Sequence, residues 1–107
     1  MQETRDEQEL IRLAGRGDQL AFETLMSAQE NRMYAVALRM CGNREDAQDC
    51  MQEAMIRIFR SISGFKGQSS FSTWVYRITM NSCLDELRRR YPNLDITSWT
   101  RENRVQM

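Results

Sequence analysis

The chain has 107 residues, of which 41% are hydrophobic and 28% are charged, and its formal net charge is zero. This length suits one domain and excludes two independent cores, and the composition is too apolar for a disordered chain. No apolar run approaches the ~20 residues that a membrane span requires, and the charged N-terminus lacks a signal-peptide core. We therefore expect a cytoplasmic protein with no membrane partner.

The zero net charge hides an uneven distribution along the chain. Residues 1–53 contain six basic and eleven acidic side chains, whereas residues 54–107 contain nine basic and four acidic ones. A basic half can attract phosphate, and an acidic half can attract a basic protein partner. The alternative, that solvated helix faces merely differ in sign, is equally compatible with the charges.

The first half of the chain predicts two helices. Apolar side chains at spacings of three and four indicate a short helix over about residues 6–14, which Gly15-Arg16-Gly17 ends. Asp18 is a good N-cap for a second, long helix that continues to Met40. Gly42 follows it in the position of a C′ glycine.

The second half predicts two more helices and a loop between them. One begins at Asn43 and keeps its apolar period to about Ile62, and the other covers about residues 71–90 and is capped by Ser69 or Ser70. Residues 61–70 are the longest stretch without a period inside the domain. The predicted fold is all-α, a compact helical bundle of three long helices plus one short N-terminal helix.

The reactive side chains argue against catalysis and against a metal site. Cys41, Cys50 and Cys83 form no CxxC pair, and the chain contains no histidine. Their number and spacing make a disulfide framework or a zinc site unexpected, so we predict buried free thiols and no cofactor. No supported acid–base or nucleophilic group is recognisable, and we expect that the protein is not an enzyme.

The last predicted helix and the loop before it have the character of a nucleic-acid site. The helix has two apolar stripes, so it is either buried on two sides or keeps one side for a partner. The loop presents an aromatic and a basic residue, Phe65-Lys66, between glycines. Aromatic rings that stack bases and cations that follow phosphates are typical of single-strand binding, and Asn81 can donate to and accept from a base edge. The first apolar stripe is Phe71, Trp74, Val75 and Ile78, the second is Tyr76, Met80, Leu84 and Leu87, and the polar row between them is Arg77, Asn81, Asp85 and Arg88.

Several motifs in this order resemble those of extracytoplasmic-function (ECF) sigma factors. Residues 64–78 resemble the promoter-melting pattern F-[RK]-G-x-[SA]-x-F-x-T-W-[LV]-Y-R-I, and residues 81–89 resemble the N-x-x-x-D-x-x-R-R sequence that reads the −10 element. Residues 42–53 resemble G-[DN]-x-E-D-A-x-D-x-x-Q-E, the family's segment that contacts RNA polymerase. The resemblance covers about residues 6–90 and implies the fold of sigma region 2.

The resemblance implies two binding surfaces. The third predicted helix would bind core RNA polymerase at the clamp helices of its largest subunit, through Asp46, Asp49, Gln52 and Glu53. Glu45 and Asp46 are also explained as partners of the helix dipole, an alternative that fits Asp49 and Glu53 less well.

The second implied surface would bind promoter DNA as a single strand. Phe65, Tyr76 and Asn81 would line a pocket for a flipped nontemplate −10 base, and Lys66, Arg77 and Arg88 would contact the backbone. Flipping a base costs a few kcal/mol, which stacking and phosphate contacts can offset. We expect Trp74 to belong to the core.

The domain boundaries follow from the same comparison. Residues 1–92 are expected to form the region 2 domain and residues 93–107 a linker or tail. We expect the C-terminal −35-binding domain of the family to be absent from this sequence. We favour truncation of a longer protein over a stand-alone domain as the explanation. An anti-sigma factor is a further expected partner. The alternative is a helical protein-interaction module, an adaptor or anti-sigma target without DNA binding, which leaves the aromatic and basic loop unexplained.

Overall fold

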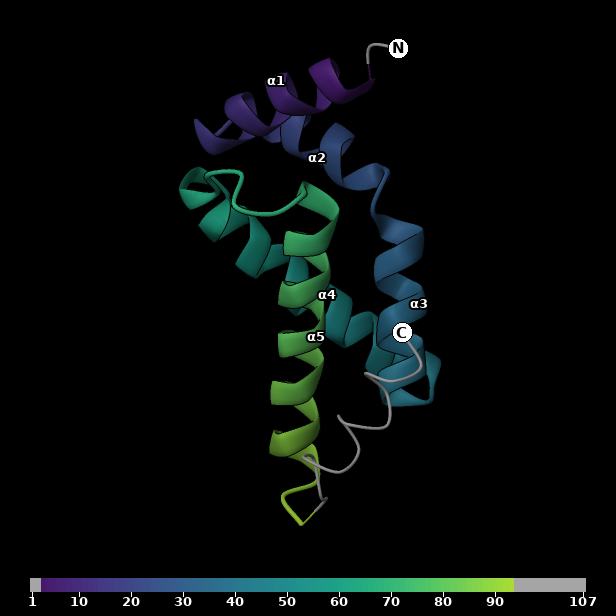
Figure 1. Cartoon of the computed structure of the whole chain (residues 1–107). Helices are drawn as coiled ribbons and strands as arrows, with labels where there is room; N and C mark the ends of the chain where they lie inside the picture. Colours follow the sequence, from purple (N-terminus) through teal and green to yellow (C-terminus); the bar gives the residue numbers. More distant parts are fainter. Residues whose placement is uncertain (1–2, 94–107) are drawn as a thin grey trace.

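The computed structural model describes residues 3–93, and every regular element in this range is helical. No helix among these residues combines the length and apolar character of a membrane span. Figure 1 shows α1 and α2 lying across one end of the packed helices α3, α4 and α5. The elements are α1 Glu3–Gly15, α2 Gln19–Ser27, α3 Glu30–Cys41, α4 Arg44–Ser61, the 3-10 turn η1 Ile62–Gly64 and α5 Phe71–Arg90.

Local side-chain hydrogen bonds set the helix starts that the sequence predicted. The carboxylate of Asp18, the amide oxygen of Asn43 and the hydroxyl of Ser70 accept from backbone N–H groups three residues further on. Each bond satisfies a donor that has no partner within its helix. Gly42 has φ 83°, the left-handed conformation that a glycine adopts freely at the end of α3.

The prediction of a single long helix from Asp18 to Met40 was wrong. The chain turns at Ala28 and Gln29, where the Gln29 N–H donates to the Met26 carbonyl at 2.8 Å, and a new helix begins. Neither glycine nor proline marks the turn. Because α2 packs on α1 while α3 packs on α4 and α5, the turn allows Met26 and Met33 to be buried in the same core. The described residues therefore form five α-helices, not three long ones and one short one.

The core has two clusters, and α5 contributes to both. Phe71 and Val75 lie in the first, and Cys83 lies in the second. The two apolar stripes of this helix are therefore explained by burial on two sides, not by an unoccupied partner face. The first cluster comprises Ala14, Phe22, Leu25, Met26, Met33, Ala54, Ile58, Ile62, Phe71 and Val75, and the second comprises Val36, Ala37, Met40, Ala47, Cys50 and Cys83.

Candidate functional site

The loop between η1 and α5 is held in a defined conformation beside α1. Phe65 leaves the 3-10 turn with extended backbone, and its N–H donates to the Ile62 carbonyl at 3.1 Å. Gly67 has φ 79°, which favours glycine at the middle of the loop. The loop residues 65–70 then enter α5 through the Ser70 cap.

The place of Phe65 in a polar loop had suggested an exposed ring, but the residue is half-buried. Its ring centroid lies 5.0 Å from that of Trp74 and 5.7 Å from that of Phe71, to which it is nearly perpendicular. Edge-to-face and tilted contacts of this kind stabilise aromatic groups beyond simple burial. Trp74, expected in the core, is itself half-buried against the first cluster. The three rings join the loop to the first turn of α5.

A cavity of about 370 Å³ opens between this loop and α1. Its size is within the range of small-ligand pockets. Its wall combines aromatic, aliphatic and polar side chains. Its α1 residues were missed by the sequence analysis, because only the tertiary structure brings residues near position 10 to residues near position 70. It is lined by Glu7, Gln8, Ile11, Phe65, Gly67, Ser69, Ser70 and Phe71.

The three residues predicted to line one base pocket are separated in the structure. Asn81 is exposed on the side of α5 that also carries Trp74, seven residues earlier, and it lies about 15 Å along the helix from Phe71. Tyr76 packs against the second core cluster, whereas Phe65 packs against the first. Of the three, only Phe65 lines the cavity beside α1.

The predicted DNA-contacting cations are on the surface. Lys66 in the loop and Arg77 and Arg88 on α5 are all exposed. A guanidinium nitrogen of Arg88 lies 3.7 Å from one carboxylate oxygen of Asp85. The other carboxylate oxygen forms an ion pair with Arg57 at 2.9 Å. Exposed ion pairs contribute little to stability, so Arg88 can exchange this partner for a phosphate at small cost.

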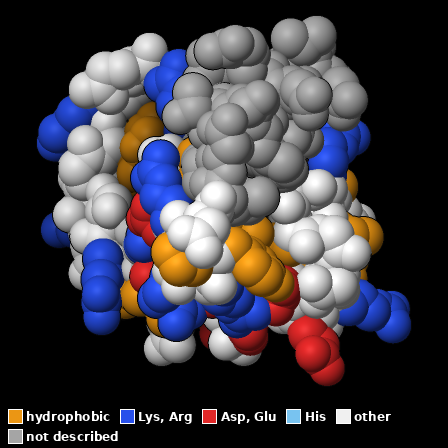
Figure 2. Space-filling model, turned by 90° about the horizontal axis from the view of Figure 1, so that it is seen from below, with side chains coloured by type: hydrophobic (Ala, Val, Ile, Leu, Met, Phe, Trp, Pro, Cys, Tyr) orange, Lys and Arg blue, Asp and Glu red, His pale blue; other side chains and the backbone are white. Residues whose placement is uncertain are grey.

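Arg90 forms ion pairs with two of the carboxylates that were predicted to bind polymerase. It pairs with Asp46 and Asp49 of α4, the latter at 2.9 Å, and with Glu86 on its own helix. The Asn43 amide and then Arg90 hold the pKa of Asp46 below its usual value. The side chain of Asp46 is only 14% exposed, against 58% for Asp49. Figure 2 shows basic and acidic side chains side by side at this end of the molecule.

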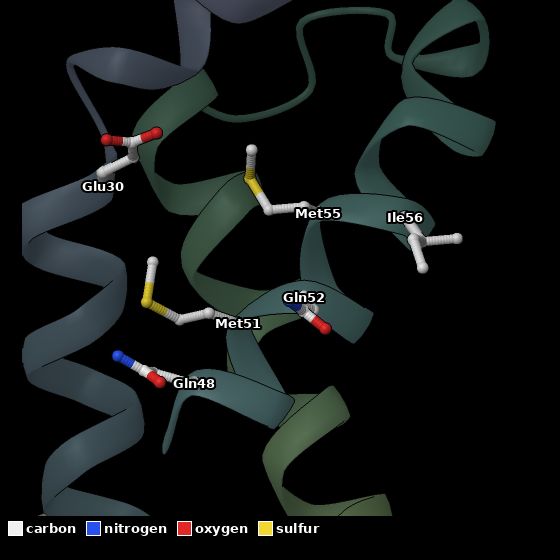
Figure 3. Close-up of a pocket in the computed structure, with 6 residues that line it drawn as sticks. All are labelled: Glu30, Gln48, Met51, Gln52, Met55 and Ile56. Atoms are coloured by element: carbon white, nitrogen blue, oxygen red, sulfur yellow. The ribbon is translucent and has the colours of Figure 1, made fainter. Parts of the chain in front are cut away.

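The other two residues predicted to bind polymerase remain accessible on α4. Glu53 accepts from Arg57 at 3.2 Å and stays about half exposed. Gln52 lines a hollow of about 510 Å³ in which the Met51 and Met55 side chains lie between α4 and the start of α3 (Figure 3). A second hollow of the same volume shares Met55 and Ile56 with the first and reaches α2. We call the two together the α4 groove, lined by Gln19, Phe22, Glu23, Glu30, Gln48, Met51, Gln52, Met55, Ile56, Phe59 and Arg60.

The family of the chain follows from its match to a known family model. Residues 25–91 match the family model described as Sigma-70 region 2. The chain belongs to the sigma-70 region 2 family. The ECF-type resemblance that the motifs indicated is confirmed by its curated relatives.

The relatives of this region 2 domain are longer proteins. It is 35% identical to the RNA polymerase sigma-H factor of Pseudomonas aeruginosa, over 86% of this chain and 49% of that one. It is 38% identical to the ECF RNA polymerase sigma-E factor of Haemophilus influenzae, over 96% of this chain and 56% of that one. The domain thus spans about half the length of these curated relatives. The predicted tail beyond Asn93 lies outside the described residues.

A solved structure has the same fold. The NMR structure of an engineered region 2 of sigmaE in complex with GTAAAA matches with a TM-score of 0.74 and 30% sequence identity. The match covers 83% of this chain and 93% of that one. The helical fold of the chain is therefore that of a sigma region 2 domain.

Proposed function

We propose that this domain binds core RNA polymerase and favours promoter opening by capturing an unpaired base of the nontemplate −10 strand. The observation that carries the proposal is the cavity between α1 and the Phe65 loop, with its aromatic and polar walls and with the exposed Lys66 beside it. The similar engineered region 2 of sigmaE was solved in complex with GTAAAA, which supports DNA as the ligand class.

A flipped base would meet two kinds of contact in this cavity. The half-buried Phe65 supplies aromatic surface, supported from beneath by the buried Phe71, and stacking on such surface contributes roughly 1–3 kcal/mol per base. The hydroxyl of Ser69 and the amide of Gln8 supply hydrogen-bonding groups for the base edge. Together these contacts offset the few kcal/mol that unpairing and unstacking cost. No bond of the base is broken, so the activity is binding and not catalysis.

The spacing of the other predicted residues suggests a path for the strand along α5. Asn81 is too far along the helix to share the base in the cavity, so we assign it to a neighbouring nucleotide. Arg77 lies between the two positions on the exposed side of α5, where it can contact the connecting phosphate, and Arg88 lies beyond Asn81. Tyr76 would act indirectly, by supporting the helix through its packing on the second core cluster.

Fluorescence anisotropy with a labelled single-stranded GTAAAA oligonucleotide and a scrambled one tests this assignment. We expect Phe65→Ala to weaken binding of GTAAAA by about tenfold, because one stacked base is lost, and to reduce the preference over the scrambled strand. Asn81→Ala should reduce the same preference without changing the thermal stability, because its side chain is exposed.

Tyr91→Ala is the matched control, since it removes an exposed aromatic ring from the far end of α5. Circular dichroism of each variant checks that the helices are retained. Equal affinities of the wild type, Phe65→Ala and Asn81→Ala for both strands would rule out the base pocket and favour the helical interaction module.

For the polymerase surface we propose the α4 groove with the accessible Gln52 and Glu53 at its edge. The groove joins apolar side chains, Ile56 and Phe59 among them, to a polar border, which is the composition of a protein-binding site. Asp49 is accessible but shared with Arg90, and Asp46 is largely covered. The contribution of Asp46 to docking would therefore be indirect, through the orientation of Arg90.

Charge reversal at Glu53 tests the polymerase surface in a pull-down with core RNA polymerase. We expect Glu53→Lys to lower the affinity for core enzyme by about tenfold, because it reverses a charge at the edge of the docking surface. Glu9→Lys is the matched control: Glu9 is also exposed and also pairs with an arginine on its own helix, but it lies on α1. Undiminished capture of Glu53→Lys would contradict the proposed surface.

A further inference from the structure

Three thiols that are far apart in the sequence meet between α3, α4 and α5. The Sγ atoms of Cys41, Cys50 and Cys83 all lie within 4.8 Å of one another, and those of Cys41 and Cys50 are 3.2 Å apart. Cys50 and Cys83 are fully buried, and Cys41 is half-buried at the end of α3. The spacing of the three cysteines in the sequence had argued against a metal site. Because the fold brings their sulfur atoms together, that argument no longer applies.

The separation of the sulfur atoms fits a shared metal ion. A tetrahedral or trigonal ion with metal–sulfur bonds of about 2.3 Å places its sulfur ligands roughly 3.8–4.0 Å apart. The closest pair here would need to separate by less than about 1 Å. Each thiol comes from a different helix, and two are fixed in the core, so the arrangement is largely preformed.

The chemistry of the three donors selects one class of ion. Thiolates are soft ligands that favour Zn(II) and Cu(I) over Mg(II) or Ca(II), which prefer oxygen. We propose that Cys41, Cys50 and Cys83 form a binding site for a single thiophilic metal ion, Zn(II) or Cu(I). The half-buried Cys41 would be the point of entry.

The three thiols influence one another's protonation. Hydrogen bonding with Cys50 and Cys83 lowers the pKa of the Cys41 thiol, whereas hydrogen bonding with Cys41 raises the pKa of Cys50 and of Cys83. Because metals bind the thiolate form, an ion held by all three thiols has to displace the protons of Cys50 and Cys83. Bound metal would tie the end of α3 to the centres of α4 and α5. It would stabilise the folded chain by mass action, since the unfolded chain holds the three thiols apart.

The test uses the full 107-residue chain in reduced form, mixed with Zn(II) alone in one arm and with Cu(I) alone in the other. Native mass spectrometry should show one ion per chain in at least one arm, and the same ion should raise the melting temperature. Replacing Cys41 with serine should weaken binding by at least about tenfold and remove the shift in melting temperature.

Ser82→Ala is the matched control, because Ser82 is buried next to Cys83 but carries no thiol. Cys83→Ser is a second variant, which should also lose the bound ion. If it does not fold, the result for Cys41→Ser is sufficient, because the side chain of Cys41 is partly exposed and its replacement should leave the fold intact. Binding of neither ion, or unchanged binding after Cys41→Ser, would overturn the site. A Cys41–Cys50 disulfide in the oxidised chain, together with no ion bound to the reduced chain, would also overturn it.

Discussion

Replacing Phe71 with alanine should lower the free energy of unfolding by about 3–5 kcal/mol, the range found for deletion of a buried aromatic ring. Phe71 is 3% exposed, begins α5 and belongs to the first core cluster. Its ring also supports those of Phe65 and Trp74. The substitution thus leaves a cavity where the loop, α5 and the core meet. Urea denaturation followed by far-ultraviolet circular dichroism measures the effect.

Tyr91→Ala provides the control for Phe71→Ala, because Tyr91 is 49% exposed and should change stability by less than about 0.5 kcal/mol. A loss of similar size in both variants would contradict the placement of Phe71 in the core. Comparison with Phe65→Ala also separates stability from binding: we expect Phe71→Ala to be the more destabilised of the two, since Phe65 is only half-buried.

Replacing either of two isoleucines on α4 with alanine should change the free energy of unfolding by very different amounts. Ile58 is completely buried in the first core cluster, and Ile58→Ala should cost about 2–5 kcal/mol of unfolding free energy. Ile56, two residues earlier, is 45% exposed and lines both hollows of the α4 groove. Ile56→Ala should leave stability within about 0.5 kcal/mol.

The same pair also tests the proposed polymerase surface, since the two substitutions remove the same atoms from opposite sides of one helix. At a temperature where both variants are folded, Ile56→Ala should weaken binding to core polymerase and Ile58→Ala should not. Chemical denaturation and the pull-down described above give the two readouts. A stability loss at Ile56 as large as that at Ile58 would contradict the structure, and unchanged polymerase binding by Ile56→Ala would count against the groove.

The sequence by itself determined the features that depend on near neighbours. The cap at Asp18, the helix start at Asn43 and the helix end at Gly42 were predicted correctly, and the cap of the last helix was narrowed to Ser69 or Ser70, of which Ser70 forms the bond. Each of these features involves residues three or four positions apart. The all-α class followed from apolar periodicity for the same reason. The order of short motifs was sufficient to indicate the sigma region 2 family.

Only the tertiary structure decided which distant side chains meet. It broke the predicted second helix near Ala28 so that α2 and α3 could pack on different partners, with no local signal in the sequence. It placed Tyr76 and Phe65 against different parts of the core, and it turned Arg90 towards Asp46, 44 residues away. The fold also gathered Cys41, Cys50 and Cys83 into one cluster. A helical period fixes which side of a helix is apolar, but the crossing of helices fixes which of these sides face each other.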